Sequence, residues 1–311
     1  MLDALLNAKI FSGSSHPKLA GEIADCLGLT LGKINIGSFP DGETSLEIME
    51  SVRGYDIFVV QTIAKDPNHY LMELLIIIDA LKRASARTIT AVIPYFGYCR
   101  QDRRAIPRVP ITAKLVADML TCAGADHILT VDLHAGQLEG FFDIPVDNII
   151  DWSSFIETIK KMHLHRLVVV APDAGSVKRA RAYARYLDTD IAIIDKLRIN
   201  AYDVEAAALI GDVEGKDVLL ADDMCSTAGT LVSAAKACRE KGANRIVAVV
   251  THGLLVGDSL KKIANSPIEA LLVGNTVPVD EQASLCSQIT IVSVASSLAQ
   301  AIRCILTKDP L

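Results

Sequence analysis

Two adjacent carboxylates are followed by small, hydroxyl-bearing residues in the stretch VLLADDMCSTAGT, residues 218–230. The apolar run predicts a strand, and Asp222 and Asp223 stand at its end, where open α/β sheets bind ligands. Small residues leading into a helix allow close backbone approach, and the N–H groups at a helix N-terminus favour a phosphate. The predicted phosphate loop consists of Ser226, Thr227, Ala228, Gly229 and Thr230.

The two carboxylates require a target other than the phosphate itself, because like charges repel. Adjacent hydroxyls or a cation would suit them, and a sugar phosphate has hydroxyls at one end and a phosphate at the other. On these residues alone, the alternative is a strand end followed by a helix cap, with both acids exposed to water. The stretch therefore indicates a sugar-phosphate site and leaves that simpler role open.

Acidic and histidine side chains follow two other predicted strands. In TVDLHAGQ, residues 130–137, Asp132 and His134 are two positions apart and are expected on the same side of a strand end. In VVVAPDAGS, residues 168–176, Asp173 ends another strand. Such residues could hold Mg²⁺ that is bound chiefly through substrate phosphates, although a lone histidine is more often a hydrogen-bonded structural residue.

A basic and aromatic segment, IPYFGYCRQDRRAIPRVP, follows a third predicted strand at residues 93–110. Arginine side chains suit phosphate oxygens, and aromatic planes can stack on a base. A solvated basic turn is the alternative, but the tyrosines and prolines make a purely solvated face less suitable. The segment therefore indicates a site for a phosphorylated or nucleotide ligand.

Two cations open a stretch, LRINAYDVEAAALIGDVEGK at residues 197–216, that has no clean helix or strand period. A long irregular loop in a compact domain is usually functional or mobile. Lys196 and Arg198 could close over a charged transition state, although a lysine at a strand end is usually a surface residue. GDVEGKD, residues 211–217, falls one residue short of a P-loop, and no common nucleotide fingerprint is present.

The elements that position these residues are short Val/Ile/Leu runs that alternate with amphipathic stretches. Continuous apolar runs predict strands buried on both faces, and the βαβα order predicts an α/β fold with mainly parallel sheets. A break near residues 141–155 divides the runs into two similar domains of about equal size. The predicted strands cover residues 56–61, 88–96, 127–133, 166–172, 191–196, 217–223, 245–253 and 289–294, and helices are predicted over 70–84, 111–124 and 230–243.

Composition narrows the function classes. Half of the 311 residues are hydrophobic and the net charge is −6, which argues against a disordered chain and against a nucleic-acid partner. No apolar run is long enough to span a bilayer and the first residues lack a basic leader, so we expect a cytoplasmic protein without a membrane partner. The seven scattered cysteines form no C-x-x-C pair and indicate reduced thiols.

Seven blocks of the chain resemble, in the expected order and nearly end to end, the ribose-phosphate pyrophosphokinase (phosphoribosyl pyrophosphate synthetase) family. The resemblance implies two domains of the phosphoribosyltransferase-like fold, over residues 1–145 and 146–311, with the last helix packing back on the first domain. It also implies a Mg²⁺-dependent transfer of the β,γ-diphosphoryl group of ATP to the 1-hydroxyl of ribose 5-phosphate. The blocks are FSGSSHPKLA (11–20), FPDGETSLEI (39–48), DPNHYLMEL (66–74), IPYFGYCRQDR (93–103), TVDLHAGQLEGFFDIPVDN (130–148), APDAGSVKRA (171–180) and DDMCSTAGT (222–230).

The resemblance assigns roles by position in the second domain. Asp222 and Asp223 would bind the ribose hydroxyls or their metal, and the phosphate loop, residues 226–230, would hold the 5-phosphate. Lys196 and Arg198 match the cations of the family's catalytic flexible loop. The residues that resemble the Mg²⁺ site are His134, in the first domain, and Asp173.

The resemblance places the ATP segment and the oligomer contacts in the first domain. Its implied partners are ATP, ribose 5-phosphate and further copies of the chain, in a homo-oligomer that is expected to be a hexamer built from dimers. ATP would be bound by one subunit's arginine-rich segment and by a hairpin of its neighbour. The residues concerned are Arg100, Gln101 and Arg103 in the segment, and Phe39, Asp41 and Glu43 in the hairpin.

Three positions depart from the family pattern: Ser226 stands where Asp is common, Ala174 where His is common and Leu197 where Arg is common. These departures bear on regulation more than on chemistry. One alternative function is a phosphoribosyltransferase that consumes the pyrophosphate; it would share the phosphate loop but needs no ATP segment. The other is a non-catalytic regulatory relative, which would be expected to carry altered key residues or an insertion in the flexible loop.

Overall fold

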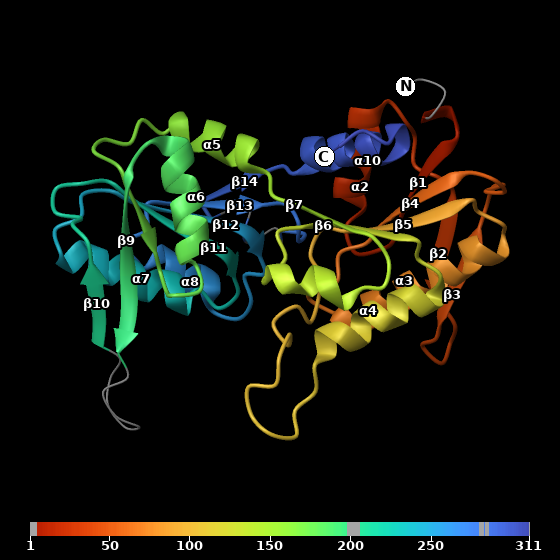
Figure 1. The fold of residues 1–311 in the computed structure, drawn as a ribbon, viewed down its shortest axis with the longest axis horizontal. Helices are drawn as coiled ribbons and strands as arrows, with labels where there is room; N and C mark the ends of the chain where they lie inside the picture. The colour runs from red at the N-terminus through yellow and green to blue at the C-terminus, as the bar shows by residue number, and fades with distance from the viewer. Residues whose placement is uncertain (1–4, 198–205, 280–282, 284–285, 311) are drawn as a thin grey trace. The chain divides into compact units, whose positions relative to one another are not determined.

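A computed structural model of the chain describes residues 5–197, 206–279, 283 and 286–310 (Figure 1). The chain divides into two compact units. The first consists of Met1–Ile150, Thr276–Pro278 and Val294–Leu311, and the second of Asp151–Asn275 and Val279–Ser293. Both units are built on an open sheet.

The first unit has a five-stranded, all-parallel sheet in the order β1-β4-β5-β6-β7. Helices α2 and α10 pack together on one face, and α3 and α4 cover the other (Figure 1). A two-stranded hairpin of β2 and β3 and a short 3₁₀ helix, η1, complete the unit. The bounds are β1 (Ala8–Ser12), α2 (Pro17–Leu27), β2 (Ile34–Ser38), β3 (Thr44–Ile48), β4 (Asp56–Val60), α3 (Pro67–Arg83), β5 (Thr88–Ile93), α4 (Thr112–Ala123), β6 (His127–Val131), η1 (Gly136–Phe141), β7 (Val146–Ile149) and α10 (Ala295–Thr307).

Helix α3 begins three residues before the helical pattern predicts, because its N-terminus is capped. The Asp66 carboxylate accepts a hydrogen bond from the His69 N–H at 3.4 Å, and Pro67 occupies the first turn. Proline suits this position because its missing N–H would have no partner there in any case. The cap therefore fixes where α3 leaves the sheet edge after β4.

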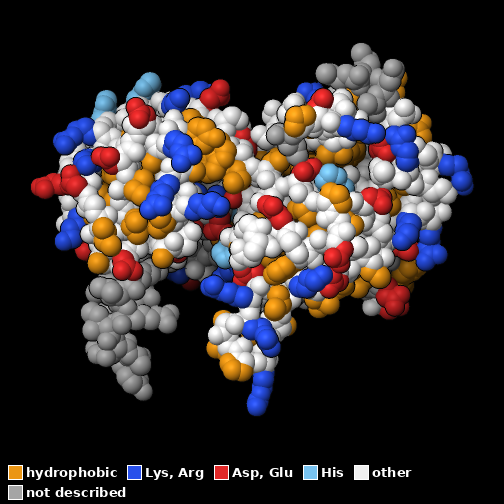
Figure 2. Space-filling view, in the orientation of Figure 1, with side chains coloured by type: hydrophobic (Ala, Val, Ile, Leu, Met, Phe, Trp, Pro, Cys, Tyr) orange, Lys and Arg blue, Asp and Glu red, His pale blue; other side chains and the backbone are white. Residues whose placement is uncertain are grey.

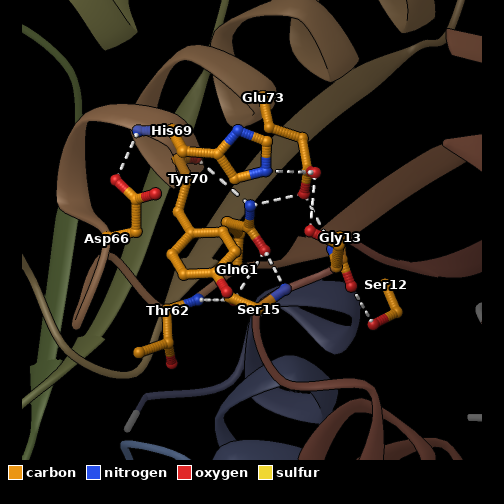
Figure 3. Close-up of polar contacts among 10 residues, drawn as sticks. Ser12, Gly13, Ser15, Gln61, Thr62, Asp66, His69, Tyr70 and Glu73 are labelled. Atoms are coloured by element: carbon orange, nitrogen blue, oxygen red, sulfur yellow. Dashed lines mark hydrogen bonds and ion pairs between the residues drawn. The ribbon is translucent and has the colours of Figure 1, made fainter. Parts of the chain in front are cut away.

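A buried polar network ties the loop after β1 to the end of β4 and to α3 (Figure 3). Glu73 on α3 is fully buried, and its carboxylate accepts from the Ser14 N–H at 2.7 Å, the Ser14 Oγ at 2.6 Å and the Gln61 Nε2 at 2.6 Å. The Gln61 Oε1 in turn accepts from the Ser15 N–H at 3.1 Å and the Ser15 Oγ at 2.6 Å. These hydrogen bonds compensate for burial of the carboxylate and fix the loop in one conformation.

Gly13 lies beside this network and leaves no room for a side chain. A Cβ added there would stand 2.3 Å from the Gln61 Oε1 and 2.9 Å from the Glu73 Oε1, both of which are held by hydrogen bonds. We expect Gly13→Ala to lower the free energy of unfolding by about 1–3 kcal/mol. Gly21→Ala on α2 is the matched control, because nothing lies within 4 Å of its added Cβ. Helix propensity predicts that this control is stabilised by about 0.5–1 kcal/mol, and urea denaturation showing equal effects would contradict the clash.

The second unit has a seven-stranded sheet in the order β10-β9-β8-β11-β12-β13-β14, parallel except for the β10–β9 pair. Leu219 and Ala221 pack with α5 and α6 on one face, while Val218 and Leu220 pack with α7 and α8 on the other. This two-sided burial explains the continuous apolar run. The bounds are α5 (Trp152–Lys160), β8 (Val168–Ala171), α6 (Val177–Leu187), β9 (Asp190–Leu197), β10 (Ala206–Ile210), β11 (Val218–Cys225), α7 (Gly229–Glu240), β12 (Ile246–Gly253), α8 (Ser259–Ala264), β13 (Ala270–Gly274) and β14 (Ile289–Val292).

The predicted α/β class with mainly parallel sheets is confirmed. The prediction of an irregular stretch over residues 197–216 is wrong in part, because β10 forms there and pairs antiparallel with β9. The sequence of β10, AAALI, has few β-branched residues, so its strand conformation depends on the pairing rather than on local propensity. Over the described part of the chain, no helix is both long enough and apolar enough to cross a membrane.

Candidate active site

The strand order of the second unit changes direction between β8 and β11, and the candidate site lies at that change. From β8 the chain runs outward to β9, and it then returns to place β11 on the other side of β8, with Val218–Leu220 opposite Val168–Val170. Ligands of open α/β sheets bind where the strand order reverses, at the carboxyl ends of the strands. Asp173 follows β8, and Asp222 and Asp223 stand near the end of β11, so the fold brings these residues together.

The phosphate loop connects β11 to α7 by a tight turn. β11 ends at Cys225, α7 begins at Gly229, and Ala228 between them has a left-handed backbone with φ 62°. For a residue with a Cβ this conformation costs about 1–2 kcal/mol, and such strain is concentrated at functional sites. Among the described residues, no side chain caps the first turn of α7. The N–H groups of that turn are therefore available to an anion.

Asp222, the first of the two acids of β11, lies in an environment that opposes its charge. Asp223 is 9 % exposed, Asp222 is half-buried, and the Asp223 N–H donates to the Asp222 Oδ1 at 2.9 Å. Burial, followed by the charges of Asp223 and Asp173, raises the pKa of the Asp222 carboxyl to about 8. A strongly shifted carboxyl among other acids at strand ends is typical of a functional site. A cation or hydroxyl donors at this place would relieve the repulsion.

Asp173 is held in place by Ser176, a residue that sequence reasoning missed. The Ser176 N–H donates to the Asp173 Oδ1 at 3.1 Å, and the Ser176 Oγ donates to the Asp173 carbonyl at 2.9 Å. The signal in the sequence was the D-x-x-S spacing before a helix, which is typical of a capping turn. Ser176 therefore orients the carboxylate at the end of β8.

His134 belongs to the first unit, and Asp173 to the second. The prediction that Asp132 and His134 share one side of a strand is wrong, because β6 ends at Val131 and Asp132 has a left-handed backbone with φ 51°. Asp132 is 2 % exposed, whereas His134 is exposed. Within the described ranges, no three His, Cys, Asp or Glu side chains gather in a way that could hold a metal ion.

The predicted ATP segment projects from the first unit between β5 and α4 (Figure 1). Figure 2 shows Lys and Arg side chains at the tip of this projection. Gln101 anchors the segment, because its N–H donates to the Tyr98 carbonyl at 2.9 Å and its carbonyl accepts from the Ala113 N–H at 3.2 Å. The segment's four arginines are exposed, and they form no ion pair with any described residue. Their guanidinium groups are therefore free to bind an anion. These residues are Arg100, Arg103, Arg104 and Arg108.

The hairpin of β2 and β3 carries the other three predicted ATP residues at its tip. Phe39 is 53 % exposed, and its N–H donates to the Glu43 carbonyl at 2.8 Å. Gly42, with φ 94°, makes the turn, and the Asp41 Oδ1 accepts from the Glu43 N–H at 3.2 Å. The tip therefore presents an aromatic face and two acids to solvent.

The two predicted catalytic cations stand where the description of the chain stops. The Lys196 backbone belongs to β9 and pairs with Ala207 of β10. The side chain of Lys196, and the whole of Arg198, lie outside the described residues. Their roles stay predictions.

Cys225, between the acids and the phosphate loop, is a buried core residue. Burial raises the pKa of its thiol, and that of the Cys238 thiol, to about 12. The thiolate is the reactive form, so we expect iodoacetamide at pH 8 to modify the exposed Cys26 and Cys122 and to leave Cys225 and Cys238 unmodified. Peptide mass spectrometry checks this, and rapid alkylation of Cys225 in the folded protein would contradict the burial argument.

An open sheet with acids and an uncapped helix N-terminus at its strand-order change defines a class of α/β proteins that bind phosphorylated ligands. The particular family follows from similarity to known proteins. Residues 8–124 match the model of the N-terminal domain of ribose phosphate pyrophosphokinase, and residues 202–311 match that of the phosphoribosyl synthetase-associated domain. The chain belongs to the ribose-phosphate pyrophosphokinase family.

Individual relatives agree with this assignment over nearly the whole chain. Ribose-phosphate pyrophosphokinase of Wolinella succinogenes is 50 % identical over 295 residues, which is 95 % of this chain and 94 % of the relative. Ribose-phosphate pyrophosphokinase A of Dictyostelium discoideum is 48 % identical and covers 95 % of this chain and 93 % of its own. The crystal structure of phosphoribosylpyrophosphate synthetase from Mycobacterium smegmatis aligns with a TM-score of 0.92 at 39 % identity, over 97 % of this chain and 99 % of that one. The predicted phosphoribosyltransferase-like fold is thereby confirmed.

Proposed function

We propose that the acceptor sugar, ribose 5-phosphate, binds at the carboxyl end of β11. The chain is a ribose-phosphate diphosphokinase, which transfers the β,γ-diphosphoryl group of ATP to the 1-hydroxyl of ribose 5-phosphate and releases AMP. The observation that carries the site assignment is the juxtaposition, on one strand, of an acidic pair with an uncapped helix N-terminus. The acids accept hydrogen bonds from the ribose hydroxyls, and the N–H groups and hydroxyls of residues 226–230 hold the 5-phosphate.

The ATP site is assigned to the first unit. The exposed arginines of the projecting segment, Arg100 and Arg103, contact the phosphates with Gln101, and the guanidinium fork suits their oxygens. Phe39, Asp41 and Glu43 of a neighbouring copy contact the adenosine, which explains why an aromatic ring stands 53 % exposed on a hairpin tip. The assembly is a homo-oligomer, and we expect a hexamer built from dimers.

The donor set of the site fits Mg²⁺ bound mainly through substrates. No cage of three protein ligands is present among the described residues. Mg²⁺ usually takes one or two carboxylates and fills its remaining positions with phosphates and water. The mutual repulsion of Asp222, Asp223 and Asp173 favours a cation near them. Asp173, beside the acids of β11, would hold the ion, and His134 of the first unit stays a predicted ligand. When bound, the ion would neutralise charge on the diphosphoryl group.

The chain's own residues position the reactants and stabilise charge. The phosphate loop and the acids of β11 orient the 1-hydroxyl for in-line attack on the β-phosphorus, and orientation alone can supply a large part of such a rate. Lys196 and Arg198 stabilise the charge that develops in the transition state. No general base is assigned, because phosphoryl-type transfer depends chiefly on positioning and electrostatics. The cytoplasm is the proposed location, since cysteines that stay as free thiols suit a reducing compartment.

One assay tests the proposed function directly. The purified protein is incubated with Mg·ATP, with and without ribose 5-phosphate, and the nucleotides are separated. AMP that forms only with the sugar is the expected result. ADP as the product, or no turnover, would contradict it. A phosphoribosyltransferase would instead consume phosphoribosyl pyrophosphate together with a base.

A further inference from the structure

The phosphate loop lacks a positive side chain of its own. Residues 226–230 read STAGT, and the residues just before them include Asp222 and Asp223. A phosphate monoester carries close to two negative charges at neutral pH. The helix N-terminus and the loop N–H groups offer only partial positive charge, and the acids oppose an anion. A side chain from another element would complete the electrostatics of this subsite.

The segment after β12 is hydrogen-bonded to the end of β11 and to the first residue of the phosphate loop. The Leu255 N–H donates to the Cys225 carbonyl at 3.1 Å, and the Val256 N–H donates to the Ser226 carbonyl at 3.0 Å. Helix α8 follows directly and also contacts α7, the helix that the loop begins. The position of α8 is therefore coupled to the position of the loop.

Lys262 of α8 directs its ammonium group at the loop. Its Nζ lies 3.4 Å from the Thr227 carbonyl oxygen, and the side chain is exposed. In the part of the chain that the structure describes, no carboxylate pairs with Lys262. Its neighbour Lys261 differs, because its Nζ lies 3.6 Å from the Asp258 Oδ1. Lys262 thus holds an uncompensated positive charge beside the loop, while Lys261 is paired with an acid of its own helix end.

We propose that Lys262 is a substrate-binding residue of the phosphate subsite, whose ammonium group moves from the Thr227 carbonyl to the phosphate oxygens of bound ribose 5-phosphate. This inference rests on the proposed function of the loop. A lysine on a flexible stem needs only a small change to make this exchange, since its donors rotate freely. In this exchange, the ammonium group gives up a weak hydrogen bond to a neutral carbonyl and forms a strong, charge-assisted hydrogen bond to a phosphate oxygen. Lys262 thereby favours a phosphorylated sugar over a free one.

The test compares Lys262→Gln with Lys261→Gln in the full-length protein. A charge-assisted hydrogen bond at an exposed site is worth roughly a tenfold change in affinity. We expect Lys262→Gln to raise the KM for ribose 5-phosphate about tenfold, with kcat and the KM for ATP close to wild type. Lys262→Arg should restore most of the affinity, and Lys261→Gln should change neither constant. The KM of Lys262→Gln should also depend less on ionic strength than that of the wild type.

Several outcomes would overturn the proposal: an unchanged KM for ribose 5-phosphate in Lys262→Gln, an equal rise for ATP, or an equal rise in Lys261→Gln. Thermal melting confirms that both variants fold, as expected for exposed side chains. Failure of the proposed function is distinguishable, because it would appear as wild-type protein that forms no AMP. In that event, calorimetric titration of ATP-free protein with ribose 5-phosphate still tests Lys262, and equal dissociation constants for wild type and Lys262→Gln would refute its role.

Discussion

Replacement of Lys196 by alanine is expected to lower kcat by about 10²- to 10³-fold while ribose 5-phosphate still binds with near wild-type affinity. The transferred group is a diphosphate, so the transition state concentrates negative charge away from the acceptor's 5-phosphate. Lys196 lies near the end of β9, the strand next to β8, and the family resemblance gives it the position of a catalytic cation. A cation that acts mainly in the transition state changes kcat far more than substrate binding.

Two measurements separate this role from a general loss of structure. Single-turnover formation of AMP reports the chemical step, and calorimetric titration reports ribose 5-phosphate binding. Lys161→Ala is the control, because Lys161 is a highly exposed lysine of the same unit, 3.9 Å from Glu157. Lys196→Arg should recover part of the rate, since charge is kept while the geometry changes. Unchanged kcat in Lys196→Ala, or an equal loss in the control, would remove Lys196 from the mechanism.

Buried strands were the easiest part of the fold to predict from the sequence. β11 and β12 are covered by helices on both faces, so the residues in the middle of each strand had to be apolar. A continuous apolar run therefore predicted each strand directly from the sequence. β10 was missed for the opposite reason. It lies at the edge of the sheet, is rich in alanine and has its conformation set by pairing with β9, which no local pattern records.

The residues of the candidate site also differ in how far the sequence alone could predict them. Asp222, Asp223 and the phosphate loop were predictable because they share one strand end and one helix start, and their spacing is local. Lys262 was not, since its contact with Thr227 joins two segments that are far apart in the sequence. Ser176 was missed although its contact with Asp173 is local and the D-x-x-S spacing signalled it. Asp132 shows where the rule that alternate strand residues share one face stops applying. Its left-handed backbone, directly after β6, ends the strand. Its buried carboxyl and the exposed His134 therefore face different surroundings.

Asp222→Asn is expected to weaken ribose 5-phosphate binding and, at the same time, to stabilise the protein. Burial and the neighbouring carboxylates raise the pKa of Asp222 from 3.8 to about 8 in the folded state. Between these values the folded state binds more protons than the unfolded state, so stability falls as the pH rises from about 4 to about 8. Asparagine has no carboxyl proton to lose and stays neutral, so the variant does not lose stability over this pH range. The gain in Tm should therefore be small near pH 5 and reach about 4 °C or more at pH 8.

The two effects of Asp222→Asn have one cause, because a carboxylate that is costly to hold in the empty site is favourable once hydroxyls or a cation face it. The KM for ribose 5-phosphate should rise at least about tenfold, and the KM for ATP should change much less. At pH 8, addition of Mg²⁺ and ribose 5-phosphate should raise the Tm of the wild type more than the Tm of the variant. Asp188→Asn is the control, because Asp188 is exposed and its left-handed backbone, φ 51°, suits asparagine equally well. Equal losses of sugar and ATP binding would contradict the acceptor-site assignment. A Tm difference that does not grow with pH would show that the charge of Asp222 is not destabilised by its surroundings.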